Sequence, residues 1–193
     1  MTLMNHELTF IQNELKKELD EPRYQHTLGV MYTASAMAMC HGADLTQALT
    51  AGLLHDCAKC IPADEKIRMC KEHEIPVIDI EYANPGLLHA KLGAYLAEEK
   101  YGILDPVILD AIRYHTTGRP EMTLMDKIIY IYDYMEPGRK ELPNMNDVRY
   151  LAFHDIDACL YRILHDSLGY LNSTGKPLDP MTAETCQYYE NKR

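Results

Sequence analysis

Signals for the starts and ends of helices recur along the whole chain, and they constrain the fold more than any other feature. Proline or aspartate opens a predicted helix at Pro22, Asp44 and Asp105. Glycine closes helical stretches at Gly42 and Gly102. Alternating apolar and polar runs joined by Asn-Gly or Asp-Gly turns, which indicate β-hairpins, do not occur. The sequence therefore predicts an all-α fold.

The same signals divide the chain into helices without indicating a second domain. No internal repeat, charge block or Gly/Ser linker interrupts it. We predict one domain over residues 1–193, with a motif-bearing core at about 22–140 and a C-terminal helical extension at about 146–193. The predicted helices cover residues 5–20, 22–42, a stretch after Asp44, 62–73, 85–101, 105–115, 123–136, 146–171 and a short tail after Asp179, with a loop over 75–85.

The charge balance limits the partners that the chain can bind. The net charge is −10, from 19 Lys and Arg against 29 Asp and Glu. Binding to nucleic acid or to anionic membranes is disfavoured, because the chain lacks the excess of positive charge that would displace counterions from phosphates. A polyanionic small molecule would have its charge met locally, by metal ions or by a few placed cations.

Targeting signals and cysteine usage indicate the compartment. The first residues lack a basic stretch followed by an apolar one, and no run approaches 18 apolar residues. The six cysteines are interpreted as reduced thiols, including the Cys57 and Cys60 pair, for which simple packing is the favoured interpretation. The sequence predicts a soluble, cytoplasmic protein.

One His-Asp pair stands in an unusual setting. His55-Asp56 ends the most apolar predicted helix, in the segment AGLLHDCAK. A buried imidazole and a buried carboxylate each need a polar partner, and a metal ion would satisfy both. The pairs His154-Asp155 and His165-Asp166 lie in amphipathic stretches, so we interpret them as solvated or locally hydrogen-bonded.

Four more candidate ligands, His26, His89, His115 and Asp133, each occupy a separate predicted helix. The carboxylate of Asp133 follows a run of isoleucines, so leaving it unpaired would be costly. Four histidines and two aspartates offer nitrogen and oxygen donors that suit iron, manganese, zinc or cobalt. Six such ligands can hold two metal ions that share one carboxylate.

The order of these residues resembles the two-metal branch of the HD-domain phosphohydrolases, and more narrowly the YqeK family of symmetrical diadenosine tetraphosphate hydrolases. The resemblance runs from about Arg23 to Arg139. It depends on R-x-x-H-x-x-G-V at 23–30, A-G-L-L-H-D-x-x-K at 51–59, L-L-H at 87–89, H-T-T-G at 115–118 and D-Y-x-E-P-G-R at 133–139. Tyr132 and Cys57 depart from the family pattern, which usually has Ala and an aromatic residue there. Tyr132 would alter the pocket if it faced inward.

The resemblance implies an HD-domain helical bundle with a metal centre between its core helices. Two divalent or mixed-valence ions, iron first and otherwise manganese, cobalt or zinc, would be bridged by Asp56. One ion would take His26, His55 and Asp133, and the other His89 and His115. The family cleaves dinucleoside tetraphosphates in the middle, giving two nucleoside diphosphates such as ADP. A metal-bridging hydroxide would attack phosphorus, since metal-bound water is acidic near neutral pH.

Further residues are candidates for contacting the substrate. Lys59 stands one helical turn after His55-Asp56 and is predicted to reach a phosphate, with a catalytic role beside Asp56. The guanidinium of Arg139 could hold a phosphate bidentately, or it could form a surface salt bridge. Thr116, Thr117 and Gly118 could contact phosphate or sugar, or form an ordinary turn at a helix end. Glu136 could contact a ribose or a water, or pair with Arg139.

Two other functions remain open at this stage. A hydrolase of mononucleotides would use the same six ligands, and it would differ in lacking room for a second nucleoside. A non-catalytic nucleotide-binding metalloprotein would use the metal as a clip between helices, with a closed coordination shell. The predicted partner is a small nucleotide substrate, with no nucleic acid and no membrane, and a homodimer remains open.

Overall fold

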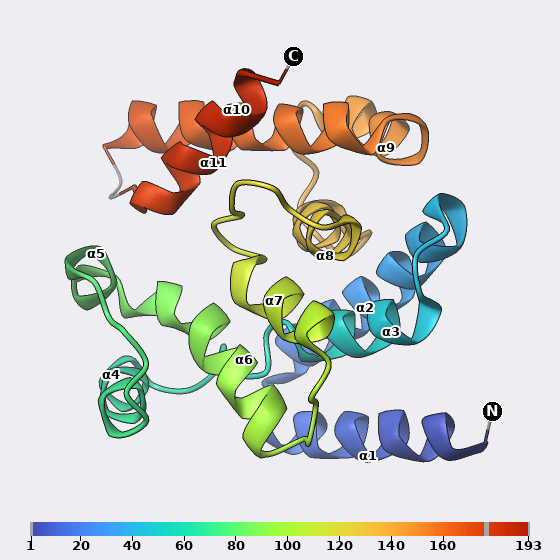
Figure 1. Cartoon of the computed structure of the whole chain (residues 1–193), viewed down its shortest axis with the longest axis vertical. Coiled ribbons are helices and arrows are strands. Elements are labelled where there is room, and N and C mark those ends of the chain that lie inside the picture. Colours follow the sequence, from blue (N-terminus) through green and yellow to red (C-terminus); the bar gives the residue numbers. More distant parts are fainter. Residues whose placement is uncertain (1, 176–177, 193) are drawn as a thin grey trace.

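Helices joined by short connections build the chain, in the order that the capping signals indicate. The computed structural model describes residues 2–175 and 178–192, and it contains no strand within these ranges. The elements are α1 (Thr2–Glu18), α2 (Glu21–His41), α3 (Leu45–Leu54), α4 (Ala63–Glu72), α5 (Asp79–Ala83), the 3-10 helix η1 (Pro85–Leu88), α6 (His89–Glu99), α7 (Pro106–Tyr114), α8 (Leu124–Met135), α9 (Met145–His154), α10 (Ile156–Thr174) and α11 (Pro180–Glu190) (Figure 1). The all-α prediction is confirmed.

Side-chain caps fix several helix ends at the predicted positions. Asp44 accepts a hydrogen bond from the backbone N–H of Gln47 and so begins α3. Thr123 and Asp126 form the reciprocal capping box that begins α8. Gly42 ends α2 in the left-handed conformation, with φ of 72°. These ends are therefore set by local chemistry that the sequence carries.

The prediction of a loop over residues 75–85 is wrong in part, because α5 forms at 79–83 and η1 starts at Pro85, while 75–78 and 84 are irregular. The buried carboxylate of Glu81 accepts from the backbone N–H of Ile78 at 2.9 Å and pairs with Lys91 Nζ of α6 at 2.7 Å. This tertiary ion pair stabilises a turn that local propensity alone does not indicate. The predicted helix over 85–101 is also divided, since η1 gives way to α6 at His89.

The single predicted helix over 146–171 is two helices, α9 and α10. Asp155 breaks it with an extended backbone conformation, at φ −152° and ψ 90°. Its side chain accepts from the N–H of Ala158 and caps α10. The tail helix after Asp179 is confirmed as α11.

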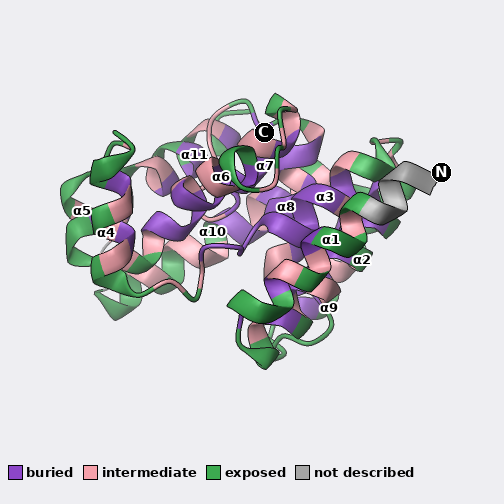
Figure 2. Cartoon of the chain, turned by 90° about the horizontal axis from the view of Figure 1, so that it is seen from below, coloured by how far each residue is buried: buried purple, intermediate pink, exposed green. Residues whose placement is uncertain are grey.

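The core lies around α8, which packs against α2, α3, α7 and α10. Figure 2 shows the buried residues concentrated on these central helices, with exposed residues on the outer faces. Gly52 of α3 allows close approach to α2, because a Cβ there would lie 2.8 Å from the Cα of Met31. No helix in the described ranges is long and apolar enough to cross a membrane.

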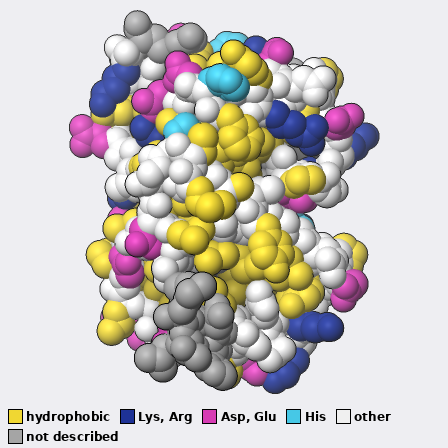
Figure 3. Space-filling model, turned by 90° about the vertical axis from the view of Figure 1, so that its right-hand side faces the viewer, with side chains coloured by type: hydrophobic (Ala, Val, Ile, Leu, Met, Phe, Trp, Pro, Cys, Tyr) yellow, Lys and Arg dark blue, Asp and Glu magenta, His cyan; other side chains and the backbone are white. Residues whose placement is uncertain are grey.

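Apolar side chains also gather on one outer face of the molecule (Figure 3). Large exposed apolar residues occur on α2 at Tyr32 and Met39 and on α9 at Tyr150 and Phe153. Met39 lies near the end of α2, whereas the candidate ligand His26 lies near its start.

Candidate metal centre

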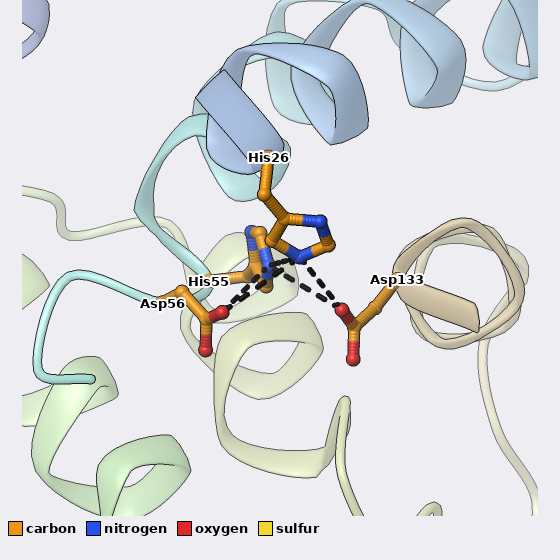
Figure 4. A group of neighbouring side chains, drawn as sticks. All are labelled: His26, His55, Asp56 and Asp133. Atoms are coloured by element: carbon orange, nitrogen blue, oxygen red, sulfur yellow. Dashed lines mark hydrogen bonds and ion pairs between the residues drawn. The ribbon is translucent and has the colours of Figure 1, made fainter. Parts of the chain in front are cut away.

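Six polar side chains from five parts of the chain meet between the central helices. Each offers a nitrogen or oxygen atom, and within each group these atoms lie within 4.8 Å of one another. The first group is His26, His55, Asp56 and Asp133, and the second is Asp56, His89 and His115. Figure 4 shows the first group, in which His26 descends from α2 and Asp133 from α8 toward His55 and Asp56. The structure therefore brings together all six predicted ligands, with Asp56 common to both groups.

The ends of helices orient three of the four histidines. His55, His89 and His115 each contact the backbone carbonyl three residues earlier through Nδ1, at 2.7, 2.6 and 2.7 Å. A carbonyl can only accept a hydrogen bond, so Nδ1 carries the proton in each ring. The lone pair is thereby placed on Nε2, which faces the cluster. Hydrogen bonds of this kind fix the tautomer and ring orientation of histidines that bind metals.

His26 is oriented by a carboxylate instead. Its Nδ1 lies 3.0 Å from Oε1 of Glu136, and its Nε2 lies 2.9 Å from Oδ1 of Asp133. Burial lowers the pKa of His26, but the two carboxylates outweigh this effect and the net pKa is raised. Glu136 is itself buried and accepts from the N–H of Gly138 at 2.6 Å. Glu136 therefore supports His26, a contact that the sequence analysis did not foresee.

Gly29 gives Glu136 the room to reach His26. A Cβ at position 29 would lie 2.6 Å from Oε2 of Glu136, so a larger residue there would displace the carboxylate. Gly29 follows His26 by three residues on α2, and Glu136 follows Asp133 by three residues at the end of α8. This spacing of one helical turn from a ligand is the sequence signal that could have identified both supporting residues.

The two oxygens of Asp56 face different groups. Oδ2 accepts from Arg23 Nη1 at 2.7 Å and lies 3.5 Å from His55 Nε2. Oδ1 lies 3.2 Å from His89 Nε2 and 3.7 Å from His115 Nε2, and it has no hydrogen-bond partner. Burial would raise the pKa of Asp56, but the surrounding histidines hold it well below its usual range. Asp56 is thus an ionised, buried carboxylate with one oxygen unsatisfied.

The geometry of the second group fits a cation. His89 and His115 bring their Nε2 atoms to 3.0 Å, and both atoms carry lone pairs because the protons are on Nδ1. Burial lowers the pKa of His89 to about 4, so its ring is neutral at neutral pH. Two facing lone pairs repel, and the nearby Oδ1 of Asp56 also lacks a partner. A divalent ion among these atoms would satisfy all three, and nitrogen with oxygen is a donor set that such ions accept.

Besides Arg23 on the shared Asp56, one cationic side chain contacts each group. Lys59 Nζ lies 3.1 Å from His89 Nε2 and 3.6 Å from Oδ1 of Asp56, and its contact with a phosphate stays a prediction. Arg139 donates from Nη2 to Oδ1 of Asp133. Its side chain therefore pairs with Asp133, whereas only its backbone N–H contacts Glu136, by donating to the backbone carbonyl.

A cavity of about 480 Å³, which we call the central cavity, opens beside the cluster. Its walls include His115, Asp133, Arg139, Thr116, Thr117, Tyr130 and Tyr134, together with Ile163, Ser167, Leu171, Asp179 and Thr182 from the C-terminal helices. No motif beyond residue 142 points to the site, so the residues of this wall were not predicted. No local pattern could have found it, because only packing of α10 and α11 brings these residues here.

Gly118 differs from the two threonines that precede it. It ends the turn after α7 with φ of 67°, and its N–H donates to the carbonyl of Tyr114 at 2.8 Å. A Cβ at this position would lie 2.8 Å from Cγ2 of Thr185 on α11. Gly118 therefore forms a helix-end turn in close contact with α11, and its contact with substrate stays a prediction.

The remaining sequence features lie away from the cluster. Asp155 caps α10, and Asp166 accepts from Arg162 at 2.6 Å, so both control His-Asp pairs are locally hydrogen-bonded or exposed. Tyr132 is only 1% exposed and its hydroxyl has no partner, but the residue does not line the central cavity. Cys57 is buried and its thiol lies 3.5 Å from the carbonyl oxygen of Gly93.

Comparison with known proteins agrees with this geometry. A family profile described as "HD domain" matches residues 23–138. A Bacillus subtilis protein named bis(5'-nucleosyl)-tetraphosphatase, symmetrical, is 42% identical over 87% of this chain and 89% of its own length. A Staphylococcus aureus protein of the same name is 34% identical over 90% of each chain. A crystal structure of a Clostridium acetobutylicum protein, described as a predicted HD superfamily hydrolase involved in NAD metabolism, has a TM-score of 0.92 at 38% identity, covering 96% of this chain and 97% of that one.

Proposed function

The chain belongs to the HD-domain family, and we propose from its site that it is a phosphoanhydride hydrolase of dinucleoside tetraphosphates. It cleaves diadenosine tetraphosphate and related compounds symmetrically into two nucleoside diphosphates such as ADP. The observation that carries the proposal is the pair of ligand groups that share Asp56 beside the central cavity. The names of relatives at 34–42% identity support the substrate class.

We propose that two divalent ions bind in the cluster. His26, His55, Asp56 and Asp133 would hold one, and Asp56, His89 and His115 the other. Iron is our first expectation, with manganese, cobalt and zinc also compatible with nitrogen and oxygen donors. When bound, the ions would acidify a water near neutral pH and neutralise charge that develops on the phosphates. Metal analysis of protein purified without added metal tests the identity.

The chain's own cations would bind the phosphates. The net charge of −10 repels a polyanion, so attraction depends on positive groups placed at the site. Lys59 and Arg139 are partly exposed at 34% and 41%, and each already contacts an atom of one ligand group. A bound tetraphosphate would draw Lys59 from His89 and Arg139 from Asp133, so both cations would contact oxygens of the reacting phosphates.

Other residues would orient the site. Glu136 holds the ring of His26, and Arg23 holds Oδ2 of Asp56, so both keep a proposed ligand in place. Thr116 places its hydroxyl 3.3 Å from His89 Nε2 and also lines the central cavity, where it could hydrogen-bond a phosphate oxygen. Because Asp56 and the rings of His55, His89 and His115 are nearly fully buried, the charge of Asp56 and the dipoles of the three rings act with little screening by water.

The test is to incubate protein loaded with iron or manganese with diadenosine tetraphosphate under reducing conditions, and to identify products by anion-exchange chromatography. We expect ADP as the only product, and no product from Asp56→Ala. ATP with AMP would overturn symmetrical cleavage. Absence of turnover with every metal would overturn the hydrolase assignment.

Two competing substrates belong in the same assay. The Clostridium structure is described as a hydrolase involved in NAD metabolism, so NAD, with two bridging phosphates, is the specific competitor. Nucleoside triphosphates test the mononucleotide alternative. We expect diadenosine tetraphosphate to have the highest kcat/KM. A higher kcat/KM for NAD or for a nucleoside triphosphate would identify that compound as the preferred substrate instead.

A further inference from the structure

Arg119 lies outside the metal cluster, in the connection between α7 and α8, and it is not among the residues that line the central cavity. Its guanidinium nevertheless contacts three side chains. Nε and Nη2 donate to Oδ2 of Asp126 at 3.0 and 2.8 Å. Nη1 lies 3.0 Å from Oδ2 of Asp110, and Cζ lies 4.6 Å from the centroid of the Tyr114 ring. These contacts use the planar fork of a guanidinium, which an ammonium group lacks.

The partners of Arg119 belong to two helices that lead to metal ligands. Asp110 lies on α7, which ends directly before His115. Asp126 lies in the first turn of α8, and Asp133 follows two turns later on the same side of this helix. The two helices pack against each other near the centre of the molecule (Figure 1). Arg119 therefore ties the helix before a second-group ligand to the helix of a first-group ligand.

We propose that Arg119 is a positioning residue that sets the separation of the two ligand groups. His115 belongs to the group with His89, and Asp133 to the group with His26, so a shift of α7 along α8 would move one group relative to the other. Two-metal sites hold their ions about 3.5–4 Å apart, where both can act on the same reacting bond. The inference rests on the proposed function in assuming that two ions bind.

The link from Arg119 to α8 is buried and charged. The side chain of Asp126 is fully buried, and within the described part of the chain Arg119 is the only cation that pairs with it. Burial lowers the pKa of Arg119, but the carboxylates of Asp126 and Asp110 outweigh this effect and the net pKa is raised. The guanidinium therefore remains charged throughout the pH range of an enzyme assay.

One oxygen of Asp126 serves both the start of α8 and the tie to α7. Oδ2 accepts from Arg119 and also from the backbone N–H of Thr123 at 2.9 Å, whereas Oδ1 is buried without a hydrogen-bond partner. The bond with Thr123 belongs to the capping box that begins α8. Loss of the guanidinium would therefore leave α8 capped but no longer tied to α7 through this residue.

The connection between α7 and α8 is itself held in shape. Gly118 and Glu121 have positive φ, of 67° and 55°, and this conformation is strained for a residue other than glycine. The backbone N–H of Met122 donates to the hydroxyl of Tyr189 at 2.9 Å, so α11 also holds the connection. Strained backbone persists only where surrounding contacts fix it. The backbone that carries Arg119 is therefore fixed as well as its side chain.

Exchange coupling between two bound manganese ions reports their separation without any substrate. Protein freed of metal would be saturated with manganese chloride and measured by electron paramagnetic resonance. We expect the wild type to give the multiline spectrum of a coupled pair. Arg119→Met should lose most of this multiline signal while metal analysis still finds two bound ions. A multiline spectrum equal to that of the wild type would overturn the role of Arg119.

Arg113→Met is the matched control. Arg113 also lies on α7 and contacts Asp110, at 3.3 Å, but this partner is on its own helix. The same change of charge and length should therefore leave the multiline spectrum as in the wild type. An equal loss of signal in both variants would overturn the inference, because charge near α7 rather than the tie to α8 would then control the coupling.

A double variant separates the missing tie from the charge that it leaves behind. Arg119→Met leaves the carboxylate of Asp126 buried and unpaired, which destabilises the fold. Combining it with Asp126→Asn removes that charge, and an amide oxygen still accepts from Thr123. We expect the double variant to have a higher Tm than Arg119→Met and still to lack the multiline signal. Return of the signal would overturn the inference, and if Arg119→Met does not fold, the double variant carries the test.

Kinetics distinguish positioning from contact with substrate. We expect Arg119→Met to lower kcat for diadenosine tetraphosphate by about tenfold and to change KM by less than about twofold, because misplaced groups slow the reaction. A larger change in KM than in kcat would overturn a positioning role. A wild type without a coupled manganese signal would overturn the proposed pair of ions, whereas coupling that survives in Arg119→Met would overturn only the role of Arg119. The two failures are thus distinguishable.

Discussion

The two ligand groups that share Asp56 are supported in different ways. In the first group, side chains hold two of the ligands, since Glu136 contacts His26 and Arg139 contacts Asp133, while the backbone carbonyl of Gly52 holds His55. In the second group, the backbone carbonyls of Gly86 in η1 and of Ile112 in α7 hold His89 and His115. The first group is also more open, since the Asp133 side chain is 21% exposed and the His89 side chain 2%.

Because of this difference, the two groups should respond differently to substitution of neighbouring residues. Charged neighbours set the electrostatics of the first group, which we call the first half of the site, as the second group is the second half. The metal affinity of the first half can therefore be changed by replacing one side chain that is not itself a ligand. Helix ends set the second group, and a carbonyl cannot be removed by a side-chain substitution. The metal affinity of the first group should respond to changes in Glu136 and Arg139, whereas no side-chain substitution removes the carbonyls that orient His89 and His115.

Asp56→Asn should have the largest effect, because it removes the charge that both halves share. We expect kcat/KM to fall by at least ~10³-fold and bound metal to fall at both sites. Metal analysis and hydrolysis of diadenosine tetraphosphate measure this. Asp155→Asn is the matched control, since it makes the same change in a His-Asp pair that only caps α10, where Asn caps equally well. Retention of two ions by Asp56→Asn would contradict a shared ligand.

His89→Ala should affect the second half alone. We expect one ion to be lost and kcat/KM to fall by more than ~10²-fold, because one of two charges that stabilise the transition state is missing. Calorimetric titration with manganese would measure the number of sites. Loss of both ions would show that the halves are not independent.

Glu136→Gln should weaken the first half by about tenfold in metal affinity, because an amide still accepts from His26 but carries no charge. The second half should keep its affinity. Two-site analysis of the same titration separates them. An equal weakening of both sites would contradict the contrast between the halves.

Gly29→Ala should have a smaller effect than Glu136→Gln, in the same direction. The new methyl group would lie 2.6 Å from Oε2 of Glu136 unless that carboxylate moves. Because the carboxylate ends a flexible side chain, we expect a loss of severalfold in affinity at the first site. An additional loss in a Gly29→Ala and Glu136→Ala double variant, beyond Glu136→Ala alone, would show that Gly29 acts by another route.

Tyr132→Phe should leave both halves unchanged and should stabilise the fold slightly. The buried hydroxyl of Tyr132 has no hydrogen-bond partner, so its removal relieves a desolvation cost of ~1 kcal/mol. In a chain of this size that corresponds to a rise of about 2–4 °C in Tm. Calorimetry of both proteins measures it. A fall in Tm, or altered metal affinity, would show that the hydroxyl has a partner that matters.

The sequence supplied the helices and the candidate ligands because both depend on local patterns. Capping residues such as Asp44 and Thr123 act on backbone groups a few positions away, so their effect is legible in the chain. The break at Asp155 was equally local, and the N-cap preference of aspartate could have indicated it. By contrast, the ion pair of Glu81 with Lys91 that stabilises α5 joins separate elements, and no local pattern reveals it.

The three His-Asp pairs show what the sequence determines and what only the tertiary structure decides. The sequence distinguished His55-Asp56 from the other two by its apolar approach, because burial of charge demands a partner. The spacing of Glu136 from Asp133 marks it as a residue near a ligand, but only the structure pairs it with His26, which lies 110 residues away. The sequence also could not give the cavity wall from α10 and α11. Local chemistry determined which residues can bind metal, whereas packing decided their neighbours, because side chains distant in sequence meet only when helices pack.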